Sequence, residues 1–293
     1  MGYSKDLHGN HLCCSFWRQQ DDPIDDLYHA ARSSMGFDDR QCQEACGLIC
    51  MRNSIRNYFM DYPPAAEILE KLELAGNVIL IGGALREFLD HSKIQDLRDI
   101  DIIVDVKNEV QWSSFIESYS LRTNRFGGHK IFCKGLLVDV WRIEQTWAFR
   151  ENIISCSHND YIRLLPKTVF LNLDSIVYDW TSEKWYKGKY LEGINSRVID
   201  VVLEKNPCLL LNIARAFALK DRYRMSLSPK LSHLIIEECK KQPSVEAFAE
   251  AILAIQRKRY YKSIFSKGRL LEDINLLSYS DTKPSDLSVG NVN

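Results

Sequence analysis

The stretch VILIGGALREFLDHSKIQDLRDIDIIVDV, residues 78–106, sets the expected architecture of this chain. Its first four residues are aliphatic or β-branched and end at two glycines, which predicts a short buried strand. A helix is expected over residues 84–90, directly after the glycines, and DIDIIVDV (99–106) predicts a second buried strand. The stretch therefore predicts a glycine turn between a strand and the N-terminus of a helix, followed by a strand that carries acidic residues.

The flanking sequence predicts an α+β fold, with a small mixed β-sheet, helices packed on it and an all-α C-terminal domain. Helices are expected over 40–60, 65–74 and 110–119, and KIFCKG (130–135) and LLVDVWRI (136–143) predict two paired strands. Beyond Asn206 the apolar residues follow helical spacing, and Ser228 is expected to cap a helix with Pro229 at its first position. The expected domains are an N-terminal helical arm (1–64), an α/β head domain (65–190), a helical domain (191–278) and a disordered tail (279–293).

The composition is that of a globular protein, with 45% hydrophobic and 26% charged residues and a formal net charge of -1. This charge gives no global attraction to nucleic acid or to a membrane, so any nucleic-acid surface must be a local patch. The sequence has neither a secretory signal pattern nor an apolar run that could span a bilayer. Nine irregularly spaced cysteines are typical of reduced thiols, so we expect a cytoplasmic location.

Three aspartates are the candidate catalytic residues and metal ligands. Asp99 and Asp101 lie two apart on a predicted strand and therefore face the same side, and Asp139 lies in the strand LLVDVW. Converging carboxylates supply the hard oxygen ligands that a pair of Mg²⁺ ions requires, with Mn²⁺ as an alternative ion. The competing interpretation is that they are ordinary exposed residues on an edge strand.

The glycine turn is the candidate nucleotide-binding element. Gly82 and Gly83 allow backbone N–H groups to approach a triphosphate closely, beside a helix N-terminus that favours anions. Arg86 adds a fixed positive charge for the same phosphates. A glycine pair is also common in turns that bind nothing.

IGGALRE followed by RDIDIIV resembles the signature of the DNA polymerase β nucleotidyltransferase superfamily. It is most similar to the head domain of CCA-adding tRNA nucleotidyltransferases and bacterial poly(A) polymerases, which have GG-x-x-R-D and then D-x-D. The resemblance extends less sharply over residues 77–220. It implies a metal site at Asp99 and Asp101, a triphosphate site at the glycine pair and Arg86, and Asp139 as the third carboxylate.

The resemblance implies a transferase that moves a nucleoside monophosphate from a nucleoside triphosphate (NTP) to an acceptor hydroxyl, with an RNA 3′ end of the tRNA type as the expected acceptor. It also implies an in-line displacement in which Asp139 helps to activate the acceptor oxygen. Two alternatives stay open. The chain could nucleotidylate a protein or small molecule, as toxin and defence enzymes do, or it could bind nucleotides with little turnover.

The sequence departs from the CCA-adding pattern at two places. Those enzymes have Arg-Asp before the segment that resembles FLNLDSIVYD (170–179), where this chain has Thr-Val-Phe at 168–170. They also carry an Asp and an Arg on a neck helix that select CTP and ATP. Leu209 and Asn212, next to Arg215, occupy those positions here, so a choice of C and A is not implied.

A basic and aromatic stretch near the C-terminus is the candidate RNA-binding surface. Cations can contact phosphates while rings stack on bases. The competing interpretation is a solvated helix end with packed aromatics. The candidate residues are Arg257, Lys258, Arg259, Tyr260 and Lys262, in a stretch that also contains Tyr261, Phe265, Lys267 and Arg269.

Two further groups carry weaker signals. Arg125, His129 and Lys130 flank the turn before Asp139 and are candidate substrate contacts, with a plain surface position equally open for His129. The cysteines at 42, 46 and 50 share a helical face, where packing against the core is favoured over a metal site. The N-terminal arm that contains them is a candidate docking segment for a protein partner.

Overall fold

The computed structural model describes residues 51–91, 94, 97, 99–124, 126–133, 135–260 and 264–281. Their contacts form two compact units, each described here by itself. The first unit contains the described residues up to Arg142 together with Tyr178–Trp185, and the second contains Ile143–Val177 and the described residues from Tyr186 onward. Most of the expected arm, including its cysteines and partner-docking role, lies outside the described residues, although residues 51–60 are helical.

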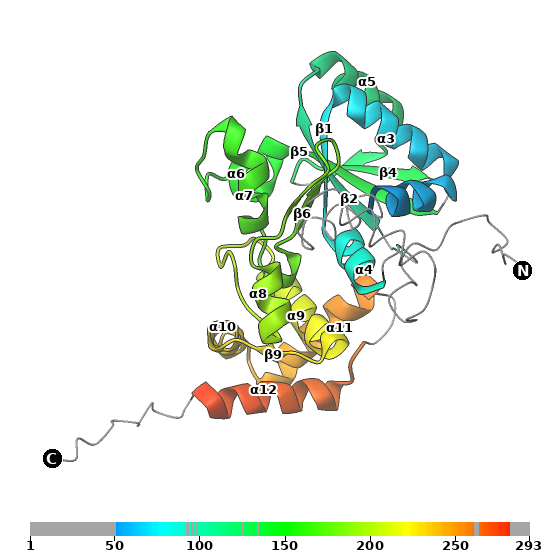
Figure 1. Cartoon of the computed structure of the whole chain (residues 1–293). Helices are drawn as coiled ribbons and strands as arrows, with labels where there is room; N and C mark the ends of the chain where they lie inside the picture. Colours follow the sequence, from blue (N-terminus) through cyan, green and yellow to red (C-terminus); the bar gives the residue numbers. More distant parts are fainter. Residues whose placement is uncertain are drawn as a thin grey trace, which may run out of the picture. The chain divides into compact units, whose positions relative to one another are not determined.

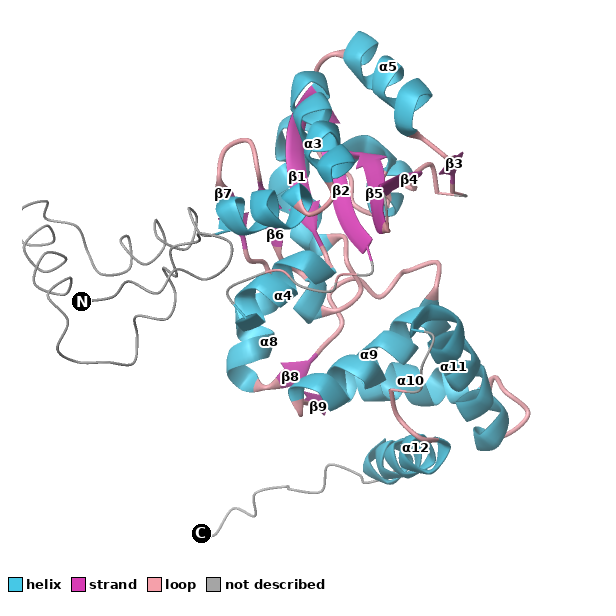
Figure 2. Cartoon of the chain, turned by 90° about the vertical axis from the view of Figure 1, so that its right-hand side faces the viewer, coloured by secondary structure: helices cyan, strands magenta, loops and turns pink. Residues whose placement is uncertain are grey.

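A mixed sheet organises the first unit (Figure 1). In the described part of the chain it has seven strands in the order β3-β4-β5-β2-β1-β6-β7. β2 is antiparallel to β1 and parallel to β5, so the two predicted buried strands lie side by side with the strand of Asp139 (Figure 2). The strands are β1 (Gly76–Ile81), β2 (Asp99–Val106), β3 (Arg122–Thr123), β4 (His129–Cys133), β5 (Leu136–Arg142), β6 (Val177–Asp179) and β7 (Lys184–Tyr186).

One face of this sheet is mainly apolar. Leu80, Ile102 and Val140 are aligned by register across β1, β2 and β5, and each is 0% exposed. Helix α5 (Glu109–Tyr119) lies on this face, because its Trp112 packs against His129, the register partner of Val140. Helix α3 (Pro63–Ala75) packs against α5. The acidic residues of β2 therefore lie on the opposite face.

The helix after the glycine turn is α4 (Gly83–His91), which contacts β1 and β2. It buries Ala84, Leu85 and Phe88, which follow one helical stripe. The strand–glycine–helix–strand order predicted from residues 78–106 is confirmed.

The second unit is mainly helical. Its long helices pack around one apolar core, and Ser228 caps α10 as predicted, because its Oγ accepts from the backbone N–H of Leu231 at 3.0 Å. The α+β fold with a helical C-terminal part is confirmed. The elements are α6 (Trp147–Arg150), α7 (Tyr161–Leu164), α8 (Tyr190–Ser196), β8 (Val198–Ile199), α9 (Leu209–Tyr223), β9 (Ser226–Leu227), α10 (Pro229–Lys240), α11 (Val245–Tyr260) and α12 (Lys267–Asp281), with short 3-10 helices between residues 143 and 174.

Helix α12 is not expected from the sequence. Its Leu270 and Ile274 are buried in the core of the second unit, so tertiary packing stabilises a helix of mixed polar and apolar composition. The helix continues to Asp281, and residues 279–281 therefore belong to it rather than to the expected tail. Residues 282–293 lie outside the described chain.

Within the described residues, no helix has both the length and the apolar composition needed to cross a bilayer.

Candidate functional site

The glycine turn at the end of β1 lies directly against one of the predicted carboxylates. Gly82 has φ +80, a backbone conformation that favours glycine, and a Cβ at this position would be 2.6 Å from Asp101 Oδ2. Gly83 begins α4, and a Cβ there would find Arg86 Nη2 at 3.9 Å. The structure therefore brings the glycine pair, Arg86 and Asp101 into one place.

The turn has the electrostatic character of an anion-binding element. The first N–H groups of a helix have no partner within the helix, and the helix dipole places partial positive charge there. Arg86 is half-buried on the first turn of α4, so its guanidinium adds a full charge to the dipole. Phosphate oxygens are the ligands that such a combination suits.

The predicted carboxylates lie on neighbouring strands and on the same face of the sheet. Asp99 and Asp101 are half-buried on β2, and Asp101 is the register partner of Asp139 on β5. Asp139 is 7% exposed. The register therefore places Asp101 between the glycine turn and the third aspartate.

A lysine holds the third aspartate. Lys130 Nζ lies 2.5 Å from Asp139 Oδ1 and 2.6 Å from Oδ2, because the antiparallel register of β4 and β5 places the two residues opposite each other. Their side chains are 21% and 10% exposed. Lys130 is one of the three candidate contacts flanking the turn before Asp139, and it is the one that the structure places with the carboxylates.

His129 does not lie with the carboxylates. It points to the opposite face of β4, where Nδ1 is 3.2 Å from Ser120 Oγ and the ring packs edge-on against Trp112. Burial lowers the pKa of His129, which favours the neutral ring. Its position contradicts the substrate-contact alternative, because neighbouring residues of a strand face opposite sides. Arg125 lies outside the described residues.

The three aspartates do not converge into one set of metal ligands in this structure. Among the described residues, the one group of three side chains with ligand atoms mutually within 4.8 Å is Glu87, Asp90 and His91 on α4. That group follows helical spacing on an accessible surface, and His91 Nε2 lies 3.5 Å from Glu87 Oε1. Both oxygens of Asp139 contact Lys130.

The chemistry of the donor set at β2 fits a divalent cation. Asp99 and Asp101 offer oxygen ligands on one strand face, beside a turn suited to phosphate, and Mg²⁺ is usually bound by one or two carboxylates plus substrate phosphates. The residues that would hold such an ion are therefore the β2 pair.

The candidate RNA-binding residues lie at the end of α11 in the second unit. Arg257 is 3.9 Å from Glu250 Oε2, and Lys258 and Arg259 share the last helical turn with it. Tyr260 is the last residue of α11, and Lys262 lies outside the described residues.

Sequence reasoning placed Arg269 in the basic stretch 257–269 but missed the second basic surface that Arg269 forms with the end of α9 in this unit. A cavity of about 550 Å³ is lined by Arg222 and Arg224 at the end of α9, by Ile264 and by Asp221 and Arg269, which form an ion pair at 3.2 Å. The run DRYR (221–224) was a local signal, but Arg269 is distant in sequence and joins the surface only through the packing of α12.

The residues at the two departures from the CCA-adding pattern have partners within the second unit. Asn212 Nδ2 donates to Asn206 Oδ1 at 2.6 Å, and Arg215 Nη2 donates to the buried Asp174 at 2.6 Å. Leu209 packs against the apolar core, and Thr168 donates to a backbone carbonyl. Each of these residues therefore makes a contact within the second unit.

Comparison with known proteins gives a likeness in structure alone. No protein-family model matches the sequence, and no curated protein is similar to it in sequence. A CCA-adding enzyme in its apo form matches with a TM-score of 0.51 and 14% identity, over 77% of this chain and 54% of the other.

Two further solved structures match with lower TM-scores, and no argument rests on them. A tRNA nucleotidyltransferase complexed with a primer tRNA and an incoming ATP analog has a TM-score of 0.47 and 14% identity, over 77% of this chain and 64% of the other. The Thermotoga maritima CCA-adding enzyme complexed with tRNA has a TM-score of 0.44 and 16% identity, over 75% of this chain and 54% of the other.

At these identities the likeness concerns the fold, and the chain spans between 54% and 64% of the length of these structures. The resemblance predicted from residues 78–106 is confirmed at that level: in fold, the chain resembles the head domain of the CCA-adding tRNA nucleotidyltransferases.

Proposed function

We propose that the chain is a metal-dependent nucleotidyltransferase that moves a nucleoside monophosphate from an NTP to the 3′ hydroxyl of an RNA. The observation that carries the proposal is the contact of the Asp101 carboxylate with Gly82, at the start of the helix that bears Arg86. It joins an acidic pair suited to a divalent cation and a turn suited to a triphosphate.

The reaction is a displacement at the α-phosphorus. The acceptor hydroxyl oxygen forms a bond to that phosphorus, the bond to the β-phosphate oxygen breaks, pyrophosphate leaves, and the hydroxyl proton passes to a base or to solvent. When bound, a divalent cation such as Mg²⁺ neutralises triphosphate charge and favours loss of the hydroxyl proton.

The residues of this chain position the triphosphate. The N–H groups at Gly82 and Gly83 and the guanidinium of Arg86 would bind its phosphate oxygens, and Asp99 and Asp101 would hold the cation. Such positioning and charge stabilisation account for most catalysis in phosphoryl transfer.

The acceptor is proposed to be RNA because the second unit carries arginines on an open surface. The cavity lined by Arg222, Arg224 and Arg269 has one carboxylate, Asp221, against three guanidinium groups. One guanidinium group can donate two parallel hydrogen bonds to phosphate oxygens, so this surface suits a sugar-phosphate backbone. The basic end of α11 adds Arg257 and Lys258 on the same unit.

The test is a transfer assay with the full-length protein. The protein is incubated with Mg²⁺, each labelled NTP in turn and total cellular RNA, and RNA and protein are then resolved separately. We expect label in RNA with the wild type and a loss of about 100-fold or more with Asp99→Asn/Asp101→Asn, because the ion would lose both ligands.

The control is Asp160→Asn, which removes an exposed carboxylate paired with Arg163 in the second unit. It should label RNA like the wild type. Label on protein would indicate a protein acceptor in place of RNA. NTP binding without pyrophosphate release would indicate a nucleotide-binding module and contradict the transferase.

A further inference from the structure

The ion pair of Lys130 and Asp139 has an unusual position for a structural salt bridge. Three neighbouring strands place Asp101, Asp139 and Lys130 in one row across the sheet. Both oxygens of Asp139 lie within 2.6 Å of the ammonium nitrogen. The third carboxylate therefore already has a cation, supplied by the chain itself.

We propose that Lys130 acts as a built-in cation for Asp139, so that the site binds one divalent ion tightly at Asp99 and Asp101 and a second ion at least about 100-fold more weakly. This inference rests on the proposed nucleotidyltransferase site. It replaces the pair of ions expected from the sequence with one metal ion and one ammonium group.

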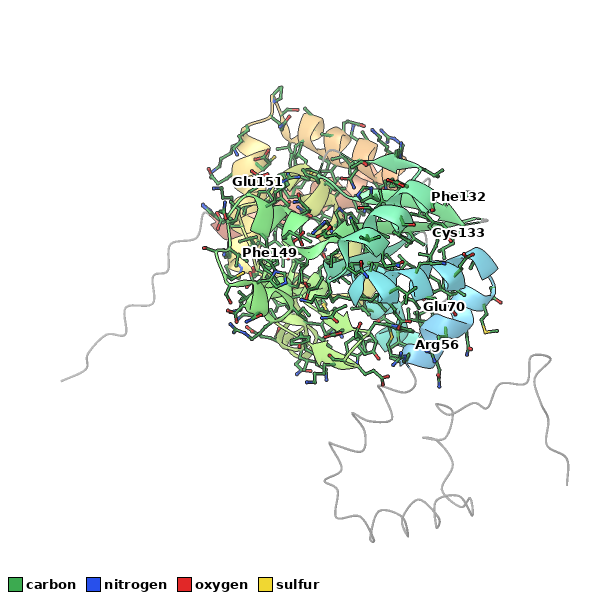
Figure 3. The ribbon with its side chains drawn as sticks, turned by 90° about the horizontal axis from the view of Figure 1, so that it is seen from above. Arg56, Glu70, Phe132, Cys133, Phe149 and Glu151 are labelled. Carbon is green, nitrogen blue, oxygen red and sulfur yellow. The ribbon has the colours of Figure 1, made fainter. Side chains whose placement is uncertain are left out.

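Burial makes the pair hard to replace. The Asp139 side chain is 10% exposed and the Lys130 side chain 21%, so water screens their attraction poorly. An incoming ion would be repelled by the ammonium group or would have to expel it. Phe132, two residues along β4, is 59% exposed and lies near the edge of the view in Figure 3, so the lower exposure of Lys130 is a property of its own position beside Asp139.

A second pair of a lysine and an aspartate, at β2, offers a matched comparison for Lys130 and Asp139. Lys107 lies 2.8 Å from Asp105 Oδ2 at the other end of β2, and its side chain is 52% exposed. This pair has the same chemistry as Lys130 and Asp139. It is farther from the glycine turn, and its lysine is more accessible.

The experiment counts bound Mn²⁺ by electron paramagnetic resonance of the free ion, using the full-length protein with a non-hydrolysable NTP analogue. We expect one tight ion in the wild type and in Lys107→Met. Lys130→Met should acquire a second ion at least about 100-fold more tightly than the wild type, and Lys130→Met/Asp139→Asn should lose it again. Lys130→Arg should bind one ion.

Folding of each variant is checked by circular dichroism. If Lys130→Met unfolds, Lys130→Gln replaces it, because the uncharged amide can still donate a hydrogen bond to Asp139. Two tight ions in the wild type, or equal binding by wild type and Lys130→Met, would overturn the built-in cation and leave the proposed function intact. No ion bound by the wild type, with no difference in Asp99→Asn/Asp101→Asn, would overturn the proposed function and this inference with it.

Discussion

Replacing each of the two adjacent glycines by alanine should separate the geometry of the site from its general packing. At Gly82 a Cβ would lie 2.6 Å from Asp101 Oδ2, where ordinary contact begins at 3.4 Å, so the carboxylate must move by about 0.8 Å. A catalytic group displaced by about 1 Å can slow a reaction by roughly 100-fold. We therefore expect Gly82→Ala to lower kcat by about that factor.

The same substitution should also reduce stability. The φ of +80 at Gly82 lies in the region that alanine disfavours by about 1–2 kcal/mol. For a domain of about 150–250 residues, this corresponds to a decrease in Tm of roughly 2–8 °C. Differential scanning fluorimetry of wild type and variant would measure it without requiring any activity.

Gly83→Ala is the matched control. Its Cβ would have Arg86 Nη2 as nearest neighbour at 3.9 Å, and it begins α4, where alanine favours the helix by up to about 1 kcal/mol. We expect an unchanged or higher Tm and a kcat within about 3-fold of wild type, with any loss appearing in KM for the NTP. A wild-type kcat in Gly82→Ala, or equal losses of Tm in both variants, would refute the contact between Gly82 and Asp101.

Three further outcomes follow from the described contacts. Gly128→Ala places a Cβ 1.9 Å from Trp141 Nε1, and because the indole ring is rigid we expect about 1–3 kcal/mol less free energy of unfolding by urea titration. Burial lowers the pKa of His129 below about 6.5. As the pH falls through about 6.5, His129 therefore binds a proton more readily in the unfolded chain than in the folded chain. The free energy of unfolding should therefore fall as pH decreases through about 6.5 and level off below the folded pKa, and His129→Gln should weaken this dependence. Arg224→Gln/Arg269→Gln should weaken RNA binding and reduce the slope of log K against log salt by about 0.7 for each phosphate that the protein no longer neutralises.

Each of these outcomes has a control. Gly268→Ala on α12 would meet no atom within 4 Å and should not destabilise the chain, and equal effects at the two glycines would contradict the packing argument. Identical pH profiles for wild type and His129→Gln would show that other groups control the acid limb. For RNA, Lys240→Gln removes a cation paired with Glu237 outside the arginine-lined cavity. An equal change in salt slope there would point to non-specific attraction.

The local order around the site could be predicted from the sequence because short-range signals agree there. The aliphatic run before Gly82 is short and ends at two glycines, which favours a buried strand over a helix, and alternation along β2 places Asp99 and Asp101 on one face whatever their partners are. The predicted strand 99–106 has the observed limits Asp99–Val106 for this reason. Helix α12 could not be predicted because its stability depends on packing in the second unit rather than on its own composition.

The sequence alone could not show which face of the sheet His129 and Lys130 occupy, because this depends on the register of β4 and β5. Both flank a glycine turn, and a change of one residue in the register of β4 and β5 would exchange their faces. The register His129↔Val140 and Lys130↔Asp139 gives His129 to the apolar face and Lys130 to the carboxylates. The arginine-lined cavity needed tertiary information in the same way, because Arg269 and Arg224 meet only in the packed helices.

The register of one strand pair therefore controls the charge of the whole site. At an effective dielectric constant near 20, two unit charges 4 Å apart interact by about 4 kcal/mol, so a divalent ion that close to the ammonium group would be repelled by about 8 kcal/mol. Breaking a buried ion pair by removing one partner costs about 3–5 kcal/mol. Expelling Lys130 is thus less unfavourable than binding beside it, and a second ion would have to displace the lysine from Asp139. Since 3–5 kcal/mol corresponds to at least about 100-fold in an equilibrium constant, the affinity for that second ion measures how firmly Lys130 is held.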